Sequence, residues 1–372
     1  MKVKFSECVE YMIKGPFGSD MKKSLYVPQG ENTYKVYIQG NALQKDEKLG
    51  DYYVSSEYFH QKLERFQVHP GDYLITCDGT LGKYIKLSDD IEPGVISSSL
   101  LLLKLDENKI YDKYFELLWE QSMLRYLASQ ARNACLVHLP SAKAIGDVEI
   151  VLPDMSIQKE IADKAFLIKA IIKKRNDELE LLDELIKARF VELFGDKGYP
   201  EDTLLNLCNI IDYRGKTPEK VESGLPFITA KNVRMHQMNL EPREYISKET
   251  YDKVMVRGFP KEGDVVFTTE APLGNVCRIP HFDTEFYIGQ RIVTLQTEKL
   301  EPIYLEYALS SDDFKMKYMG KSSGSTVTGI RVRLLEQLTI PVPPIELQSQ
   351  FAAFVEQTDK SKFENHNFIS GY

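Results

Sequence analysis

The chain has little of what marks a metal-binding or disulfide-stabilised protein. No Cys-x-x-Cys pair occurs, so we expect free thiols in a reducing compartment. The six histidines are scattered and none has a His-x-x-x-His partner, which argues against a zinc site. The five cysteines are far apart and odd in number: Cys8, Cys77, Cys135, Cys208 and Cys277.

Glycine-rich loops and long apolar runs are missing as well. No Gly-x-Gly occurs, which argues against glycine loops for a dinucleotide or for S-adenosylmethionine. No apolar stretch is long enough to span a bilayer, and residues 1–10 lack the apolar run of a signal peptide. The sequence therefore predicts a cytoplasmic protein with no metal, no cofactor and no catalytic residues of its own.

Composition and charge are those of an ordinary globular protein. The 372 residues are 43% hydrophobic and 27% charged, and this length predicts two domains. The net charge is -8, whereas a nucleic-acid-binding domain usually has a basic surface. Because a net charge is an average, an acidic chain can still have a local basic face, and the charge has to be examined by segment.

The sequence contains a diverged tandem duplication. GDYLITCDGTLG at 71–82 matches GDVVFTTEAPLG at 263–274, and YYVSSEYFHQKL at 52–63 matches EYISKETYDKVM at 244–255, both with an offset of 192 residues. LPDMSIQKEIA at 152–162 matches VPPIELQSQFA at 342–352 with an offset of 190. A period this long is too large for a solenoid repeat, so each copy is predicted to be a domain followed by a tail.

Each copy combines strand-like and helical patterns. Glycine-bounded segments at 34–40, 71–77 and 95–105 favour strands, and residues 112–131 have helical apolar spacing. The second copy repeats this with strands at 224–230, 264–270 and 291–297 and a helix at 303–319. The predicted fold class is α+β, with two pseudo-repeated mixed α/β domains separated by long helices that form an antiparallel coiled coil. The predicted segments are domain one at 1–150, a spacer helix at 151–197, domain two at 198–342 and a C-terminal helix at 343–372.

The first tail predicts one long helix. Residues 156–194 contain neither Gly nor Pro, and apolar residues recur at alternating spacings of three and four, which favours a coiled coil. A long helix packed on its own domain is the alternative. Since Tyr372 aligns with Leu182 in the duplication, the second helix is expected to be shorter than the first. We expect this to weaken assembly with one partner subunit, or to be compensated by pairing with another copy of the chain. The residues predicted at the interface are Ile161, Ile168, Ile172, Leu179, Leu182, Ile186, Leu193, Phe351 and Val355.

Two matching windows, 125–143 and 315–333, contain basic residues and no acidic residue. Loops of this kind suit phosphate oxygens and base edges, although a solvated loop at a helix end has a similar composition. The DNA-binding candidates in the first window are Arg125, Arg132, Asn133, His138 and Lys143. Those in the second window are Lys321, Ser323, Ser325, Thr326, Arg331 and Arg333.

Residues that come after the first strand of each copy are a second group of candidates. Gln39 and Asn41 in copy one, and Lys231, Asn232 and Arg234 in copy two, have side chains that suit base reading, although an exposed loop would look the same. The repeated acids Asp78 and Glu270 stand beside turns, where such residues are usually structural.

The chain resembles the specificity subunit of Type I restriction-modification systems. The resemblance is carried by residues 152–166, 188–196, 214–234 and 324–352 and covers essentially the whole chain. It implies two target-recognition domains, each of which binds one half of a bipartite duplex site, and helices that hold the halves apart and bind modification subunits. It also implies that the modification and restriction subunits, which use S-adenosylmethionine, ATP and Mg²⁺, methylate adenine and cleave the DNA.

Other functions are compatible with the sequence. A coiled-coil scaffold that binds protein partners fits the acidic composition, and an inactive donor copy of a specificity subunit fits the short second tail. A methyltransferase that acts alone would need a cofactor loop that the sequence does not show.

Overall fold

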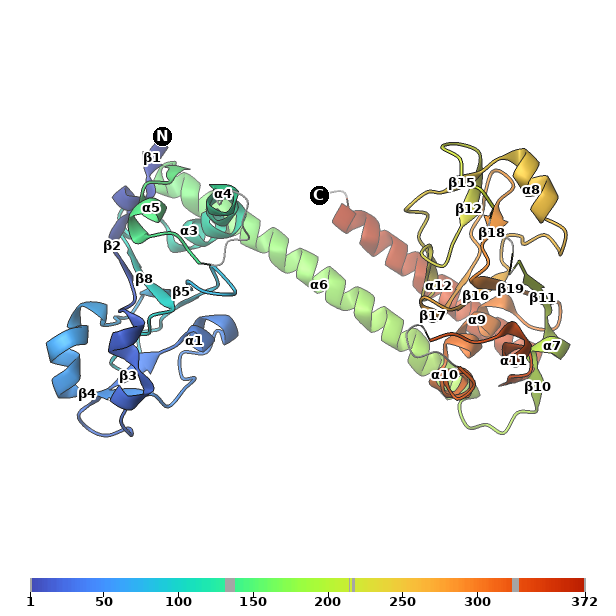
Figure 1. The fold of residues 1–372 in the computed structure, drawn as a ribbon, viewed down its shortest axis with the longest axis horizontal. Helices are drawn as coiled ribbons and strands as arrows, with labels where there is room; N and C mark the ends of the chain where they lie inside the picture. The colour runs from blue at the N-terminus through green and yellow to red at the C-terminus, as the bar shows by residue number, and fades with distance from the viewer. Residues whose placement is uncertain (1, 131–137, 214, 216–217, 323–327, 371–372) are drawn as a thin grey trace. The chain divides into compact units, whose positions relative to one another are not determined.

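The structure is a computed structural model that describes residues 2–130, 138–213, 215, 218–322 and 328–370. The chain divides into a first unit, Met1–Ile171, and a second unit, Ile172–Tyr372, and each has its own core (Figure 1). Both units mix helices and sheets, as the sequence predicts. Among the described helices, none is both long enough and apolar enough to cross a membrane.

The first unit is built on a four-stranded antiparallel sheet with the order β2-β8-β5-β6. A second sheet has the order β4-β3-β7, in which β3 and β7 run parallel, and β1 pairs with β9. The strands are β1 (Lys2–Lys4), β2 (Val9–Lys14), β3 (Thr33–Tyr37), β4 (Tyr53–Ser55), β5 (Tyr73–Thr76), β6 (Tyr84–Lys86), β7 (Gly94–Ile96), β8 (Leu100–Leu105) and β9 (Glu149–Val151).

The four-stranded sheet is a middle layer, which explains the leucine run of β8. Leu101 and Leu103 pack in the core beneath the helices, whereas Leu100 and Leu102 pack in the core shared with the second sheet. Side chains alternate between the two faces of a strand, so a strand buried on both faces is apolar throughout. The helices are α1 (Gln39–Gln44), α2 (Ser56–Tyr58), α3 (Asp112–Leu118), α4 (Leu124–Gln130) and α5 (Ala142–Gly146), with a π-helical turn at Trp119–Met123.

The second unit has the same sheets in the same order. Its sheets are β11-β19-β16-β17, β15-β12-β18 and β10-β20, with an added hairpin of β13 and β14. The strands are β10 (Glu201–Thr203), β11 (Asn209–Asp212), β12 (Leu225–Ile228), β13 (Val233–Arg234), β14 (Gln237–Met238), β15 (Tyr245–Ile246), β16 (Val265–Thr269), β17 (Leu273–Arg278), β18 (Tyr287–Ile288), β19 (Ile292–Gln296) and β20 (Thr339–Pro341). The helices within this unit are α7 (Leu204–Leu207), α8 (Lys248–Val254), α9 (Pro302–Ser310), α10 (Asp312–Met319) and α11 (Val332–Leu335).

The duplicated segments of the sequence have the same structural task in both units. Asp72 accepts a hydrogen bond from His69 N at 2.8 Å, and Asp264 accepts one from Lys261 N at 2.8 Å, so each carboxylate closes the turn before a central strand. Both carboxylates are buried, and burial raises the pKa of each.

The glycines that end the duplicated segment allow a helix to approach the turn closely. Gly82 and Gly274 both have positive φ, of 72° and 93°. A Cβ atom at Gly82 would overlap Leu124, and one at Gly274 would overlap Tyr318, so helices α4 and α10 pack directly against the two turns. Glycine is needed here both for its backbone conformation and for its lack of a side chain.

The long helix α6 (Met155–Phe194) is continuous for 40 residues, which agrees with the uninterrupted helix predicted over 156–194. Its last part packs in the second unit against α12 (Ile345–Ser370). Phe194 lies 5.6 Å from Phe351 between ring centroids, and Asp183 pairs with Lys362 at 2.6 Å. A step back along α6 from Phe194 to Asp183 thus corresponds to a step forward along α12 from Phe351 to Lys362, so the two helices run antiparallel here.

The predicted seam is not continuous within this chain. Ile186, Phe351 and Val355 are buried together and Leu193 packs beside them, whereas Ile172, Leu179 and Leu182 are only half-buried. In the first unit Ile161 and Ile168 are 39% and 44% exposed. These two side chains are therefore not buried by the described residues of this unit, and their place in a coiled-coil or subunit interface stays a prediction.

The four described cysteines are free and buried, as predicted. Burial raises the pKa of Cys8 and Cys77 to about 11 and that of Cys208 and Cys277 to about 12. These thiols therefore stay protonated and behave as small hydrophobic residues. Cys135 lies outside the described residues.

Candidate nucleic-acid interface

In each unit a loop from an acid-free window lies against the repeated acidic turn. In the first unit Leu139 N donates to Cys77 O at 2.8 Å, and His138 Nδ1 is 2.7 Å from Asp78 Oδ1. In the second unit Ile330 N donates to Thr269 O at 2.9 Å, and Glu270 forms a bridge with Gly329. We call residues 78–82 the Asp78 turn and residues 270–274 the Glu270 turn.

Two predicted site residues of the first unit meet at the Asp78 turn. Gln39 Nε2 donates to Asp78 O at 2.6 Å, and the His138 imidazole contacts the Asp78 carboxylate. The His138 side chain is 68% exposed and that of Asp78 is 41% exposed, so this cluster faces solvent. The start of α1, the Asp78 turn and the loop at His138 thus form one surface.

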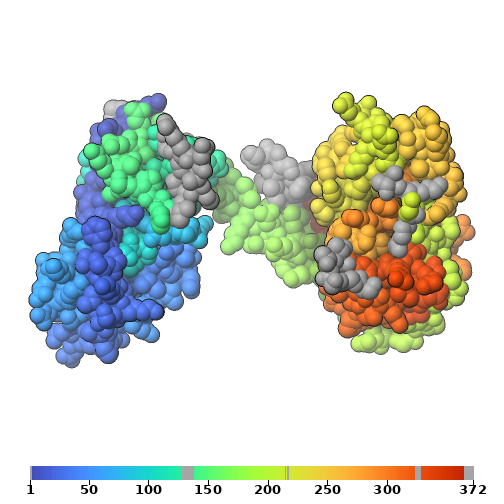
Figure 2. Space-filling view, viewed as in Figure 1, coloured from blue at the N-terminus to red at the C-terminus, as the bar shows by residue number. Residues whose placement is uncertain are grey.

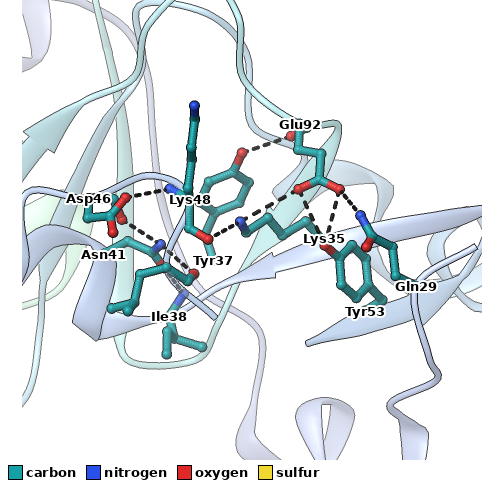
Figure 3. A network of polar contacts seen from close by, with 10 residues as sticks. Gln29, Lys35, Tyr37, Ile38, Asn41, Asp46, Lys48, Tyr53 and Glu92 are labelled. Atoms are coloured by element: carbon teal, nitrogen blue, oxygen red, sulfur yellow. Dashed lines mark hydrogen bonds and ion pairs between the residues drawn. The ribbon is translucent and has the colours of Figure 1, made fainter. Parts of the chain in front are cut away.

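Asn41 is a correction to the sequence-based prediction. It was expected to read a base edge, but its side chain is fully buried. Its Oδ1 accepts from Ile38 N at 2.7 Å, and its Nδ2 donates to Asp46 O and Leu49 O, both at 2.9 Å (Figure 3). All of its hydrogen-bonding atoms are used to close the loop around α1, because a buried amide must be satisfied internally.

Asn232 is corrected in the same way. It is 2% exposed, its Oδ1 accepts from Thr229 N at 2.9 Å, and its Nδ2 donates to Asn239 O at 3.0 Å and Pro242 O at 3.2 Å. The matching asparagines of the two units therefore brace the segment after β3 or β12 and position the residues near them, the half-buried Gln39 and the exposed Lys231.

A buried lysine supports the same loop in the first unit (Figure 3). Lys35 is 3% exposed; its Nζ donates to Lys48 O at 2.9 Å and lies 3.6 Å from a carboxylate oxygen of Glu92. Glu92 also accepts hydrogen bonds from Gln29 at 2.9 Å and Tyr53 at 3.1 Å. This network fixes the loop on which Gln39 depends.

Replacing Asn41 by alanine is expected to destabilise the first unit by about 2 kcal/mol, because Ile38 N–H loses its acceptor and two carbonyls lose a donor. Chemical denaturation followed by circular dichroism measures this change. Gln44→Ala, an exposed change in the same helix, is the matched control and should leave stability within about 0.5 kcal/mol of wild type. Equal stability of the two variants would contradict the bracing role.

The second unit has a group of exposed cations near the Glu270 turn. Lys231 comes after β12, Arg234 is in the β13–β14 hairpin, and Arg331 starts α11 directly after the loop that contacts Thr269. Arg333 and Lys321 are also exposed. Arg291 pairs with Glu270 at 3.0 Å, and its side chain remains 53% exposed. Within the described residues no hydrogen bond or ion pair occupies the side chains of Lys231, Arg234 or Arg331, so they are available for an anionic ligand.

The structure does not bring every candidate to this surface. Arg125 and Lys143 are exposed on α4 and α5, but no described hydrogen bond or ion pair joins them to the Asp78 turn. The candidates that lie outside the described residues are Arg132, Asn133, Ser323, Ser325 and Thr326.

Sequence reasoning missed a buried ionic cluster beneath the β13–β14 hairpin. Glu306, in α9, is 1% exposed; one carboxylate oxygen is 2.8 Å from His236 Nδ1 and the other accepts from Arg278 Nε at 2.6 Å. Burial alone would lower the pKa of Arg278, but the Glu306 carboxylate raises it. His236 also stacks on Tyr307 at 4.2 Å between ring centroids. The hairpin that contains Arg234 is therefore anchored to helix α9. The signal was available, since Glu306 interrupts an otherwise apolar helix.

No metal centre is evident in the described part of the chain, where no group of three His, Cys, Asp or Glu side chains is placed to hold an ion. Each unit instead has an exposed surface at its acidic turn, the Asp78 turn or the Glu270 turn. Amide and imidazole groups are present at the first surface, and lysine and arginine groups at the second. Such groups bind phosphates and base edges, which defines the class as a nucleic-acid-binding protein with a repeated binding domain.

Comparisons with known proteins agree with this class. Residues 202–370 match the family model described as Type I restriction modification DNA specificity domain. The chain is 25% identical to the Type I restriction enzyme MjaVIII specificity subunit of Methanocaldococcus jannaschii, over 87% of this chain and 83% of the relative. It is 24% identical to the Type I restriction enzyme EcoBI specificity subunit of Escherichia coli, over 82% of this chain and 70% of the relative.

The fold is also found in solved structures. The crystal structure of the S subunit of a Type I restriction-modification system from M. genitalium superposes with a TM-score of 0.57 at 15% identity, over 100% of this chain and 92% of that one. A structure from work on complex assembly and conformational transition of the type I R-M system gives 0.55 at 16% identity, over 100% and 95%. The chain is therefore similar along most of its length to specificity subunits of Type I restriction-modification systems, and its residues 202–370 match the DNA specificity domain of that family.

Proposed function

We propose that this chain is the sequence-specific DNA-recognition subunit of a Type I restriction-modification complex, and that each unit reads one half of a bipartite duplex site. The observation that carries the proposal is the repeated surface. In both units an acid-free loop pairs with the acidic turn through equivalent contacts, and in the first unit Gln39, after the first strand of the smaller sheet, also reaches this turn. Two copies of one binding surface with different exposed side chains suit two different half-sites.

The chemistry of the exposed groups supports duplex DNA as the ligand. Arg331, Arg234 and Lys231 are exposed and unpaired in the described structure, and arginine is the commonest side chain to read guanine in the major groove. Lysines beside them suit phosphates, which fix position without reading sequence. The overall charge of -8 does not oppose this, because binding depends on the local surface.

The catalytic steps belong to partner subunits in this proposal. The specificity subunit is the non-catalytic component, and modification and restriction subunits would supply S-adenosylmethionine-dependent adenine methylation and ATP- and Mg²⁺-dependent cleavage. The helices α6 and α12 would act as the spacer between the target-recognition domains and as the surface that binds these subunits. The exposed apolar residues of α6, among them Leu167, Leu181 and Leu185, suit such a contact. A chain with this task would work in the cytoplasm, where the bacterial or archaeal DNA is.

Sequencing the methylated sites of cells with and without this chain tests the function directly. We expect one bipartite adenine-methylated motif that disappears with the chain. The purified complex should bind a duplex with this motif, and its affinity should fall linearly on a log–log plot as salt is raised, because phosphate contacts release counterions. Binding that ignores DNA sequence would favour a protein scaffold, and full subunit binding without any methylated motif would indicate an inactive donor copy.

Lengthening α6 tests the spacer role. Inserting seven residues between Lys173 and Lys174 adds about 10 Å of helix and rotates the C-terminal remainder of the helix by only about 20°. We expect the unspecified interval of the methylated motif to change in length, with both half-sites unchanged. An unaltered interval in an active, folded variant would show that α6 does not set this spacing.

A further inference from the structure

The first unit presents one aromatic side chain almost fully to solvent. Phe17 is 79% exposed, the largest value among the large hydrophobic side chains of the described residues. It belongs to the segment Gly15-Pro16-Phe17-Gly18 after β2, in the N-terminal part of the chain that reaches the surface of the first unit as dark blue in Figure 2. Covering an exposed aromatic ring with a binding partner is energetically favourable. We therefore asked where this ring lies relative to the candidate interface.

The backbone on both sides of Phe17 is fixed. Gly15 N donates to Leu100 O at 2.8 Å, and a Cβ at Gly15 would overlap the carbonyl of Ser97, so the segment packs closely on the turn before β8. On the other side Phe17 O accepts from Asp20 N at 2.8 Å, and Met21 is buried in the core. The ring therefore projects from an ordered support.

This support adjoins the cluster at the Asp78 turn. Lys14 Nζ donates to Leu139 O at 3.4 Å, one residue beyond His138. Ser97, which Gly15 contacts, donates its N–H to Tyr37 O at 2.8 Å, two residues before Gln39. The Phe17 segment is thus tied to both stretches of chain that carry the predicted readers of the first unit.

The second unit has different chemistry at the corresponding place. Strand pairing places Lys14 opposite Leu101 and Asp212 opposite Val293, and Leu101 and Val293 are 192 residues apart, as in the duplication. The segment after Asp212 therefore corresponds to the Phe17 segment, and its sequence Tyr-Arg-Gly-Lys-Thr offers cations and no exposed ring. In this segment Arg214, Lys216 and Thr217 lie outside the described residues. A ring in one unit and cations in the other suit readers of different half-sites.

We propose that Phe17 is a specificity-determining residue of the first unit and that its ring contacts a base of the half-site that this unit reads. Apolar side chains discriminate bases through van der Waals contact, for example with the thymine methyl group or by wedging against a base step. The inference rests on the proposed function, since it needs the first unit to bind duplex DNA.

The experiment uses the complex of this chain with its modification subunits and the motif found for the wild type. Affinity is measured for the cognate duplex and for duplexes with each base pair of both half-sites changed in turn. Phe17→Ala should bind the cognate duplex roughly tenfold more weakly and lose discrimination at one position of a single half-site. Phe17→Tyr, which keeps the ring, should retain that discrimination.

A matched control separates this effect from the loss of any exposed ring. Phe259 is 63% exposed in the second unit, at the end of its central sheet where Phe259 O accepts from Gln296 at 3.1 Å, which is opposite to the Glu270 turn. Phe259→Ala should leave both half-sites unchanged. Since Phe17 is exposed, Phe17→Ala should also unfold at the wild-type temperature.

Each result has one meaning. Unchanged affinity and discrimination in Phe17→Ala overturn the role of Phe17 while the recognition function stands. A uniform loss across all duplexes overturns it too, because it would show a contact without sequence preference. If the wild-type complex binds all duplexes equally, the proposed function itself fails.

Discussion

Replacing Arg331 and Arg333 together by alanine is expected to abolish recognition of the half-site read by the second unit. Both side chains are exposed beside the loop that contacts Thr269, and a bidentate arginine–guanine contact supplies roughly 1–3 kcal/mol of discrimination. Two such contacts correspond to a loss of about 30-fold to 10⁴-fold between the cognate and the altered half-site. In methylome sequencing, this loss should appear as a motif in which only the half-site read by the second unit is degenerate.

The matched control removes two lysines elsewhere in the second unit. Lys253 is on α8, and Lys299 donates to Asn206 O at 2.5 Å near the end of the sheet that is remote from the Glu270 turn. Lys253→Ala with Lys299→Ala changes the net charge by the same amount, and we expect the motif to persist. If the arginine variant also methylates the wild-type motif, these arginines are not readers.

Replacing Gly274 by alanine is expected to destabilise the second unit by about 3 kcal/mol. Gly274 has φ of 93°, which costs an alanine roughly 1–2 kcal/mol, and its Cβ would overlap the Tyr318 hydroxyl, which adds about 1–3 kcal/mol of overpacking. Tyr318 cannot move freely, because it is 5% exposed and its ring lies 5.5 Å from that of Phe267. Urea denaturation of the second unit's transition measures the loss.

Gly263→Ala isolates the backbone contribution. Gly263 has a similar φ of 85°, but nothing lies within 4 Å of the added Cβ, so only about 1–2 kcal/mol should be lost. Combining Gly274→Ala with Tyr318→Phe should recover part of the stability, since the overlapping hydroxyl is removed. Equal losses at Gly263 and Gly274, or no recovery in the double variant, would contradict close packing of α10 on the turn.

Much of the fold can be predicted from local sequence patterns. The Gly- and Pro-free run 156–194 predicts α6, which begins at Met155 and ends at Phe194, because helix propensity and its breakers act within a few residues. The strand predicted at 264–270 is β16, since alternation and glycine punctuation are also local. Where one continuous helix was expected over 303–319, Ser311 caps a new helix and divides it into α9 and α10.

The candidate site was only partly predictable, and the reason is the range of the interactions. Gln39 and His138 were identified from residue type and repeat position, and the fold brings both to Asp78. Asn41 has the same residue type as a base reader, but whether its amide faces solvent depends on the backbone carbonyls of a later loop. Phe17 was not among the residues predicted from the sequence, and only the structure shows its exposed ring.

The sequence by itself determined the duplication, the long helix, the mixed α+β class and the absence of a recognisable catalytic motif, because these depend on order and spacing along the chain. Only the tertiary structure decided which polar groups are available to a ligand. The Glu306 carboxylate contacts His236 and accepts a hydrogen bond from Arg278, 70 and 28 residues away, while Arg331 has no side-chain partner among the described residues. Burial and pairing are set by contacts between distant segments, and no local pattern specifies them.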